Sequence, residues 1–198
     1  DKNDVRDEMQ DRVPERRVTK ETMTATAEEE RAYDILTQLH LAMDDARGGG
    51  QQLFATSLEK ALFSSPVACA ETIAHRLKKL DHLAADPKTS KERRAAAQND
   101  SAILRPLATA VAAITPAAFS RYQHLLALLK SSVYGWNPKA KDDRVVIFTE
   151  RVATMTFLAE HLARDLELKP DAIAQISGSM SDEDQQAVVE QFGRREAS

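Results

Sequence analysis

The chain has 198 residues, of which 42% are hydrophobic and 29% are charged, and its formal net charge is -4. This composition excludes wholesale disorder and is typical of a soluble protein with a packed core. The small acidic charge offers no overall attraction to nucleic acid or to anionic membranes, so any polyanion site must be local.

The first predicted helix follows a charged segment at the start of the chain. Residues 1–20 are charge-dense with few apolar anchors, and we expect them to be extended. Thr26 and Glu29 form a capping-box pattern in front of apolar residues that recur at helical spacing between Ala32 and Met43. The Gly48-Gly49-Gly50 run then predicts the end of this helix.

Further helices are predicted as far as residue 130. A second helix carries an apolar stripe over 53–63, and Ser65 followed by Pro66 is a typical N-cap and first helical residue for a third. The Ala-rich stretch 86–116 predicts a helix around 103–114, and another helix follows with a stripe over 119–129. Together these elements predict a helical subdomain.

The C-terminal part of the chain has a different pattern. Val145-Val146-Ile147-Phe148 is a continuous β-branched and aromatic run, which predicts a strand buried on both faces of a parallel sheet. A helical stripe follows over 153–166, and Ile173 to Ile176 predicts a second strand. Ser181 and Asp184 then repeat the capping-box pattern before a final helix. The predicted order is β-α-β-α, and the overall class is α/β although most of the chain is helical.

The two loops that follow the predicted strands are the candidate binding sites. In a parallel sheet the strand ends that lead into helices lie along one edge, so we expect these loops to lie side by side. The candidate site residues in them are Thr149, Glu150, Arg151, Gly178, Ser179 and Ser181.

Three segments together resemble the superfamily-two helicases, and within them the Swi/Snf-like group of DNA-dependent ATPases. VVIFTE and the later ISGSMS with its helix ending in QF are similar to the opening half of that family's second RecA-like domain. VPERRVTKETMTATAEEERAYDIL resembles the passage that leaves the first motor domain. LEKALFSSPVACAETIAHRL resembles the helix-Ser-Ser-Pro-helix element between the motor domains.

The resemblance implies a division of the chain and a function. Residues 1–23 would be a linker from the first motor domain, 24–131 a helical subdomain, 132–143 a connector, and 144–198 the N-terminal half of a RecA-like domain. The implied function is an ATP-dependent helicase or translocase, with DNA as the expected nucleic acid. The candidate loops would then present hydroxyls and backbone N–H groups to phosphates.

No complete ATPase site is expected within these residues. The sequence contains no G-x-x-x-x-G-K-[ST] loop, so the resemblance implies that ATP and Mg²⁺ are bound mainly by other segments of a longer protein. The chain begins with Asp1 and ends soon after a helical pattern, and we expect it to be a piece of such a protein. None of its five histidines has an i,i+4 partner histidine or a Cys pair, so we expect no metal site. Without a phosphate-binding loop, we also expect no catalytic residue in this chain.

Alternatives remain open at the level of the residues. Thr149 is also typical of an ordinary helix cap, and Asp182, Glu183 and Asp184 would repel a phosphate at the second loop. A second hypothesis treats the helices from Thr24 to Lys130 as a protein-interaction module whose apolar stripes bind a partner. A free-standing α/β enzyme is less favoured, because no nucleophile–base pair is present.

The compartment is predicted from the cysteine content and from hydropathy. Cys69 is the single cysteine and has no partner for an internal disulfide. No apolar run approaches the roughly 20 residues of a transmembrane helix, and the chain begins without a signal segment. We therefore expect a cytoplasmic protein without a membrane partner.

Overall fold

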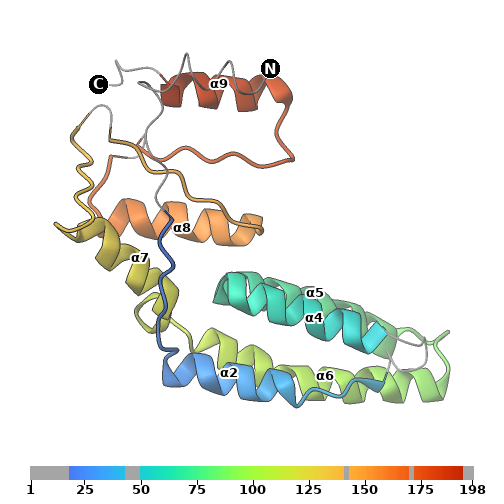
Figure 1. The fold of residues 1–198 in the computed structure, drawn as a ribbon. Coiled ribbons are helices and arrows are strands. Elements are labelled where there is room, and N and C mark those ends of the chain that lie inside the picture. The colour runs from blue at the N-terminus through green and yellow to red at the C-terminus, as the bar shows by residue number, and fades with distance from the viewer. Residues whose placement is uncertain (1–17, 43–49, 141–142, 170–171, 194–198) are drawn as a thin grey trace, which may run out of the picture.

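The structure is a computed structural model that describes residues 18–42, 50–140, 143–169 and 172–193. Within these residues it contains α-helices and one short 3-10 helix but no β-strand (Figure 1). The elements are α2 (Ala27–Thr37), α4 (Gly50–Ser64), α5 (Pro66–Ala85), α6 (Lys91–Ala112), η1 (Pro116–Ala118), α7 (Ser120–Lys130), α8 (Val152–Asp165) and α9 (Asp182–Gly193).

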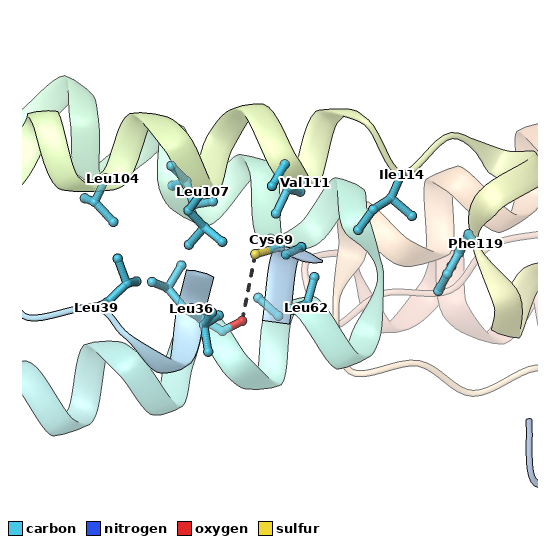
Figure 2. Packing of buried hydrophobic residues seen from close by; sticks show 14 of the residues in the cluster. Leu36, Leu39, Leu62, Cys69, Leu104, Leu107, Val111, Ile114 and Phe119 are labelled. Carbon is cyan, nitrogen blue, oxygen red and sulfur yellow. Dashed lines mark hydrogen bonds between the residues drawn. The ribbon is translucent and has the colours of Figure 1, made fainter. Parts of the chain in front are cut away.

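The longest helices pack as a two-layer bundle. α5 and α6 form a hairpin, α4 packs on α5, and α2 packs on α6 and α4 (Figure 1). Buried aliphatic side chains from all of these helices fill the space between the layers (Figure 2). The same apolar cluster extends through Phe119 to Phe157 and Leu162, so α8 shares its core with the bundle.

The predicted helix starts are confirmed where side chains satisfy backbone N–H groups. Thr26 accepts a hydrogen bond from the Glu29 backbone, and the Glu29 carboxylate accepts one from the Thr26 backbone at 2.8 Å. Glu29 also accepts hydrogen bonds from the backbone and the hydroxyl of Ser120 at 3.2 and 3.1 Å. Ser65 caps α5 with Pro66 at its first position, as predicted. The capping box of α2 therefore also connects that helix to the start of α7.

Helix α6 is longer than predicted from the Ala-rich stretch. It begins at Lys91, where Ser90 caps it, and it runs through the exposed Pro106 to Ala112. Its length matches that of α5, against which it packs, and Asp100 is fully buried between the helices. The Asp100 carboxylate accepts a hydrogen bond from the backbone N–H of Ala42 at 2.8 Å. Tertiary packing thus extends the helix over residues whose own pattern is weak.

The predicted parallel strands are wrong, and with them the expected α/β class and the β-α-β-α RecA-like unit. Residues 145–148 and 173–176 form no regular secondary structure, and no backbone hydrogen bond pairs them. Val146, Ile147 and Phe148 are 59%, 39% and 93% exposed instead of buried.

The reason is that a strand buried on both faces needs backbone partners on its two sides and helices on both faces. Among the described residues neither condition is met, because α8 packs on α5 and α7 instead of covering a sheet. The helices predicted after the strands are confirmed as α8 and α9. The proposed division of the chain near residue 144 stays a prediction.

Candidate nucleic-acid interface

Three hydroxyl groups hold the first turn of α8 against the junction of α4 and α5. The Thr154 hydroxyl lies 2.7 Å from those of both Ser64 and Ser65, and we call these three residues the hydroxyl cluster. Ser65 also accepts a hydrogen bond from the backbone N–H of Ala68 at 3.1 Å. Ser65 and Thr154 are buried. The Ser-Ser-Pro element and the helix after VVIFTE are therefore in direct contact.

Aromatic side chains hold the later turns of α8 against α7. The Phe157 ring lies edge-on to Tyr122 with centroids 5.4 Å apart, and tilted against His161 at 4.3 Å. The Tyr122 hydroxyl donates a hydrogen bond to Asp165. Burial and this hydrogen bond raise the pKa of Tyr122 above its ordinary value. Hydrogen bonds from Arg164 and Tyr122 lower the pKa of Asp165 to about 2. α8 is thus held along its whole length.

An open groove of about 460 Å³ lies between α4, α7 and the first two turns of α8. Lys60 and Arg121 line it from α4 and α7, and Thr149 and Glu150 line it from the segment before α8. The Arg121 guanidinium lies 5.2 Å from the centroid of the Phe63 ring, a cation–π contact that positions its charge on the groove wall. Two cations from separate helices therefore face the segment that the sequence predicted to bind phosphate.

The N-terminus of α8 lies at this groove without a side-chain cap. Arg151 occupies the N-cap position, no side chain caps the helix there, and the first turn contains no acidic residue. The Thr149 side chain accepts a hydrogen bond from the Arg151 backbone at 3.4 Å. Among the residues that the structure describes, the Thr149 hydroxyl has no acceptor for its own hydrogen. A helix N-terminus of this kind attracts anions through its free N–H groups and its dipole.

The other two candidates in the first loop have different surroundings. The Arg151 side chain turns toward α4 and donates a hydrogen bond to the backbone oxygen of Ser57 at 3.4 Å. Glu150 is exposed and lines the groove, where its charge opposes the binding of a phosphate. Thr149 is therefore the candidate whose position agrees best with a backbone contact.

The second predicted loop is bonded to itself and to α9. The hydroxyls of Ser177 and Ser179 lie 2.8 Å apart. Ser181 accepts a hydrogen bond from the Asp184 backbone at 3.1 Å and donates one to its carboxylate at 2.7 Å. Gly178 is exposed, with no heavy atom within 4 Å of the position that a Cβ would occupy.

The structure does not connect the two loops. In the described part of the chain no hydrogen bond joins residues 149–151 to residues 177–181. Acidic residues occupy the first turn of α9. A nucleic-acid contact by Gly178, Ser179 and Ser181 stays a prediction.

Sequence reasoning did not find Lys60 and Arg121. Each occupies a polar position beside a buried residue, Ala61 and Tyr122 respectively. That pattern is typical of any solvent-facing side chain on an amphipathic helix. Only the packing of α4 beside α7 and α8 brings the two charges to one groove.

Across the described residues, no helix is long and apolar enough to cross a membrane, and no group of three or more His, Cys, Asp or Glu side chains is arranged to hold a metal ion. Comparison of the chain with protein-family models, curated proteins and solved structures found no match.

Proposed function

We propose that the chain is part of an ATP-driven nucleic-acid helicase or translocase and that it contributes a contact with the sugar-phosphate backbone. The observation that carries this proposal is the uncapped N-terminus of α8, which lies at a groove lined by Lys60 and Arg121. The resemblance of VVIFTE, of the Ser-Ser-Pro element and of ISGSMS to superfamily-two helicases supports the same function.

The groove has the chemistry that a phosphodiester requires. Backbone N–H groups at a helix N-terminus, a free hydroxyl on Thr149 and two cationic side chains are all donors, and a phosphate group offers acceptors only. The exposed Glu150 offsets one of the two cations, which predicts weak, salt-sensitive binding. Contacts of this kind position a nucleic-acid strand without reading its sequence.

The ATP-dependent part of the proposal rests on the resemblance alone. The sequence contains no phosphate-binding loop of the G-x-x-x-x-G-K-[ST] type, and we propose that ATP and Mg²⁺ bind to segments outside these residues. In that arrangement, ATP binding and hydrolysis would close and reopen two motor domains while the groove holds the backbone. We propose the cytoplasm as the compartment and DNA as the nucleic acid.

The backbone contact is tested by fluorescence anisotropy with labelled DNA and RNA oligonucleotides over a range of salt concentrations. In Lys60→Ala/Arg121→Ala we expect binding to weaken and the slope of log K against log salt to fall by about 2, one for each lost phosphate contact. The matched control is Lys139→Ala/Lys169→Ala, which removes the same charge from exposed positions outside the groove. Equal binding by the two double variants would contradict the groove as the contact site.

The motor itself is tested by ATP hydrolysis. We expect a longer protein that contains this chain and a phosphate-binding loop to hydrolyse ATP faster when DNA is added, and Thr149→Val to reduce this stimulation. The 198 residues alone should not hydrolyse ATP. The absence of DNA-stimulated hydrolysis in the longer protein would refute the motor.

A protein-interaction module is the second candidate function. Leu53, Phe63 and Val67 are 75%, 46% and 43% exposed on α4 and α5, which leaves apolar side chains open on the helical subdomain. Sedimentation velocity of the chain, alone and with Leu53→Glu/Val67→Glu, measures whether these side chains mediate association. The module would be favoured if the unchanged chain associates, the double variant does not, and neither binds nucleic acid.

A further inference from the structure

The solvent-facing side of α5 carries a group of basic residues that the groove does not use. Lys78, Lys79 and His82 lie three, four and seven residues after His75, and we call these four residues the α5 basic face. All four are exposed, and they line a second hollow of about 450 Å³. Their positions lie opposite the buried face of α5, which includes Ile73 and Leu80.

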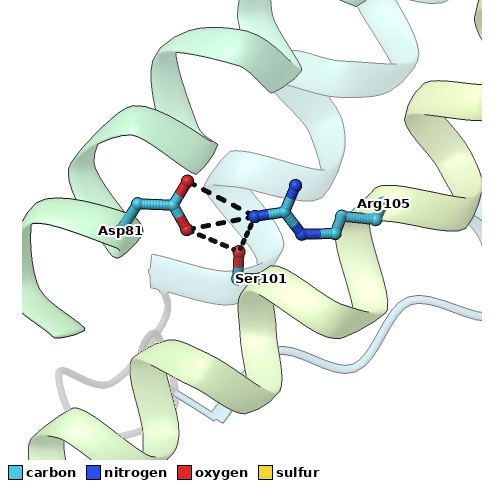
Figure 3. Close-up of polar contacts among 3 residues, drawn as sticks. All are labelled: Asp81, Ser101 and Arg105. Carbon is cyan, nitrogen blue, oxygen red and sulfur yellow. Dashed lines mark hydrogen bonds and ion pairs between the residues drawn. The ribbon is translucent and has the colours of Figure 1, made fainter.

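The acidic residue within this stretch is turned toward the neighbouring helix. Asp81 accepts a hydrogen bond from the Ser101 hydroxyl at 3.0 Å and pairs with the Arg105 guanidinium at 3.3 Å, both on α6 (Figure 3). Its charge is thus compensated on the α6 side of α5. Two other acids, Glu71 and Asp86, lie beyond the two ends of the basic face.

The stretch between these two acids is positive. In the described part of the chain neither Lys78 nor Lys79 has a carboxylate within ion-pair distance. Lysine is a compact point charge that binds phosphate without a fixed geometry, and histidine adds ring N–H donors. The hollow is lined by these four side chains, and no Phe, Tyr or Trp ring of the described residues lines it.

We propose that the α5 basic face binds the phosphodiester backbone of duplex DNA as a second contact beside the groove. This inference rests on the proposed function and adds the form of its substrate. The four residues span about 10 Å along the helix axis, which covers about three phosphates of one DNA strand. The basic residues match a polyanion in charge, and a lining without Phe, Tyr or Trp favours a paired backbone over unpaired bases.

The position of the basic face predicts a length dependence. Ser64 lines the groove. Lys78 lies about 20 Å from Ser64 along the axis of α5, which corresponds to about six base pairs of duplex DNA. A duplex that reaches both contacts must therefore exceed this length. Short duplexes would bind at one contact only and lose the combined affinity.

The experiment is anisotropy with a labelled 20-base-pair duplex at several salt concentrations, using Lys78→Ala/Lys79→Ala. We expect the slope of log K against log salt to fall by about 2 and binding at 0.1 M salt to weaken by roughly 10- to 60-fold. The matched control is Lys88→Ala/Lys91→Ala, which removes two exposed lysines, one in the turn after α5 and one at the first position of α6. This control should stay within about threefold of the unchanged chain, because salt screens charges that do not touch DNA.

A second readout does not depend on substitutions. Acetylation of lysines, followed by mass spectrometry, should show protection of Lys78 and Lys79 by the duplex, and none of Lys88 and Lys91. Circular dichroism of each variant checks that the helices are retained.

The outcomes separate this inference from the proposed function. If Lys60→Ala/Arg121→Ala loses affinity for DNA while Lys78→Ala/Lys79→Ala binds as tightly as its control, the basic face is refuted and the groove is supported. If the reverse holds, the basic face is supported and the groove is refuted. The inference is overturned if the unchanged chain binds no nucleic acid. It is also overturned if the unchanged chain binds poly-glutamate but does not bind DNA.

Discussion

Replacement of Thr154 by valine tests the contact on which the position of α8 depends. Valine keeps the shape of threonine but removes the hydroxyl that lies 2.7 Å from both Ser64 and Ser65. Ser64 is half-buried and can exchange its lost partner for water. Ser65 is fully buried, and its hydroxyl is left with the Ala68 N–H donor but without an acceptor for its own hydrogen.

The expected loss of stability follows from the hydrogen bond that Ser65 loses. A buried hydroxyl that loses its partner destabilises a protein by about 1–3 kcal/mol, so Thr154→Val should lower the free energy of unfolding by about 2 kcal/mol. For a chain of this length, that loss corresponds to a fall in Tm of roughly 4–8 °C. No cavity term is added, because the two side chains have nearly the same volume.

The assay is urea unfolding followed by circular dichroism. The control is Thr156→Val on the same helix, where the side chain is exposed and the expected change stays within about 0.5 kcal/mol. A double-mutant cycle with Ser65→Ala should give a coupling energy of about 1 kcal/mol between the two hydroxyls. Equal stability of Thr154→Val and Thr156→Val, or a coupling energy near zero, would refute the hydroxyl cluster as the anchor of α8.

Two further predictions concern titratable groups. Because the pKa of Asp165 is lowered to about 2, its stabilising effect is present above its ordinary pKa of 3.8 and is lost as the pH falls from there toward 2. Asp165→Asn should therefore cost about 1 kcal/mol at pH 7 and almost nothing at pH 2, and an equal cost at both values would contradict this assignment. Burial raises the pKa of the Cys69 thiol to about 12, so iodoacetamide at pH 8 should alkylate it roughly a thousandfold more slowly in the folded chain than in urea. Mass spectrometry measures both rates, and equal rates would show that Cys69 is accessible.

Local patterns correctly predicted several helix starts, but α6 begins earlier than expected, at Lys91, and α2 ends at Thr37 instead of continuing to the Gly48-Gly49-Gly50 run. The capping box of Thr26 and Glu29, the N-cap at Ser65 and the cap at Ser181 all form as predicted, because each joins residues that are close in the sequence. The burial of Cys69 on an Ala-rich helix is confirmed as well. Figure 2 shows its sulfur directed at the backbone oxygen of Leu58.

Non-local partners explain what local patterns missed. The apolar run Val145 to Phe148 indicates burial, but a strand forms only where other segments accept its backbone hydrogen bonds, and the described residues supply none. The helicase resemblance implies a phosphate contact for Thr149, whereas Lys60 and Arg121 are far apart in the sequence and carry no signal of their own.

By itself, the sequence determined where the capped helices α2, α5 and α9 begin, which helix faces are apolar and that the C-terminal part contains an exceptional apolar run. Tertiary structure alone decided that this run has no strand partner among the described residues, that α8 joins the helical core and that two distant cations line one groove. The physical reason is that capping and periodicity act within one or two helical turns, whereas pairing of strands and convergence of charges depend on how whole helices pack.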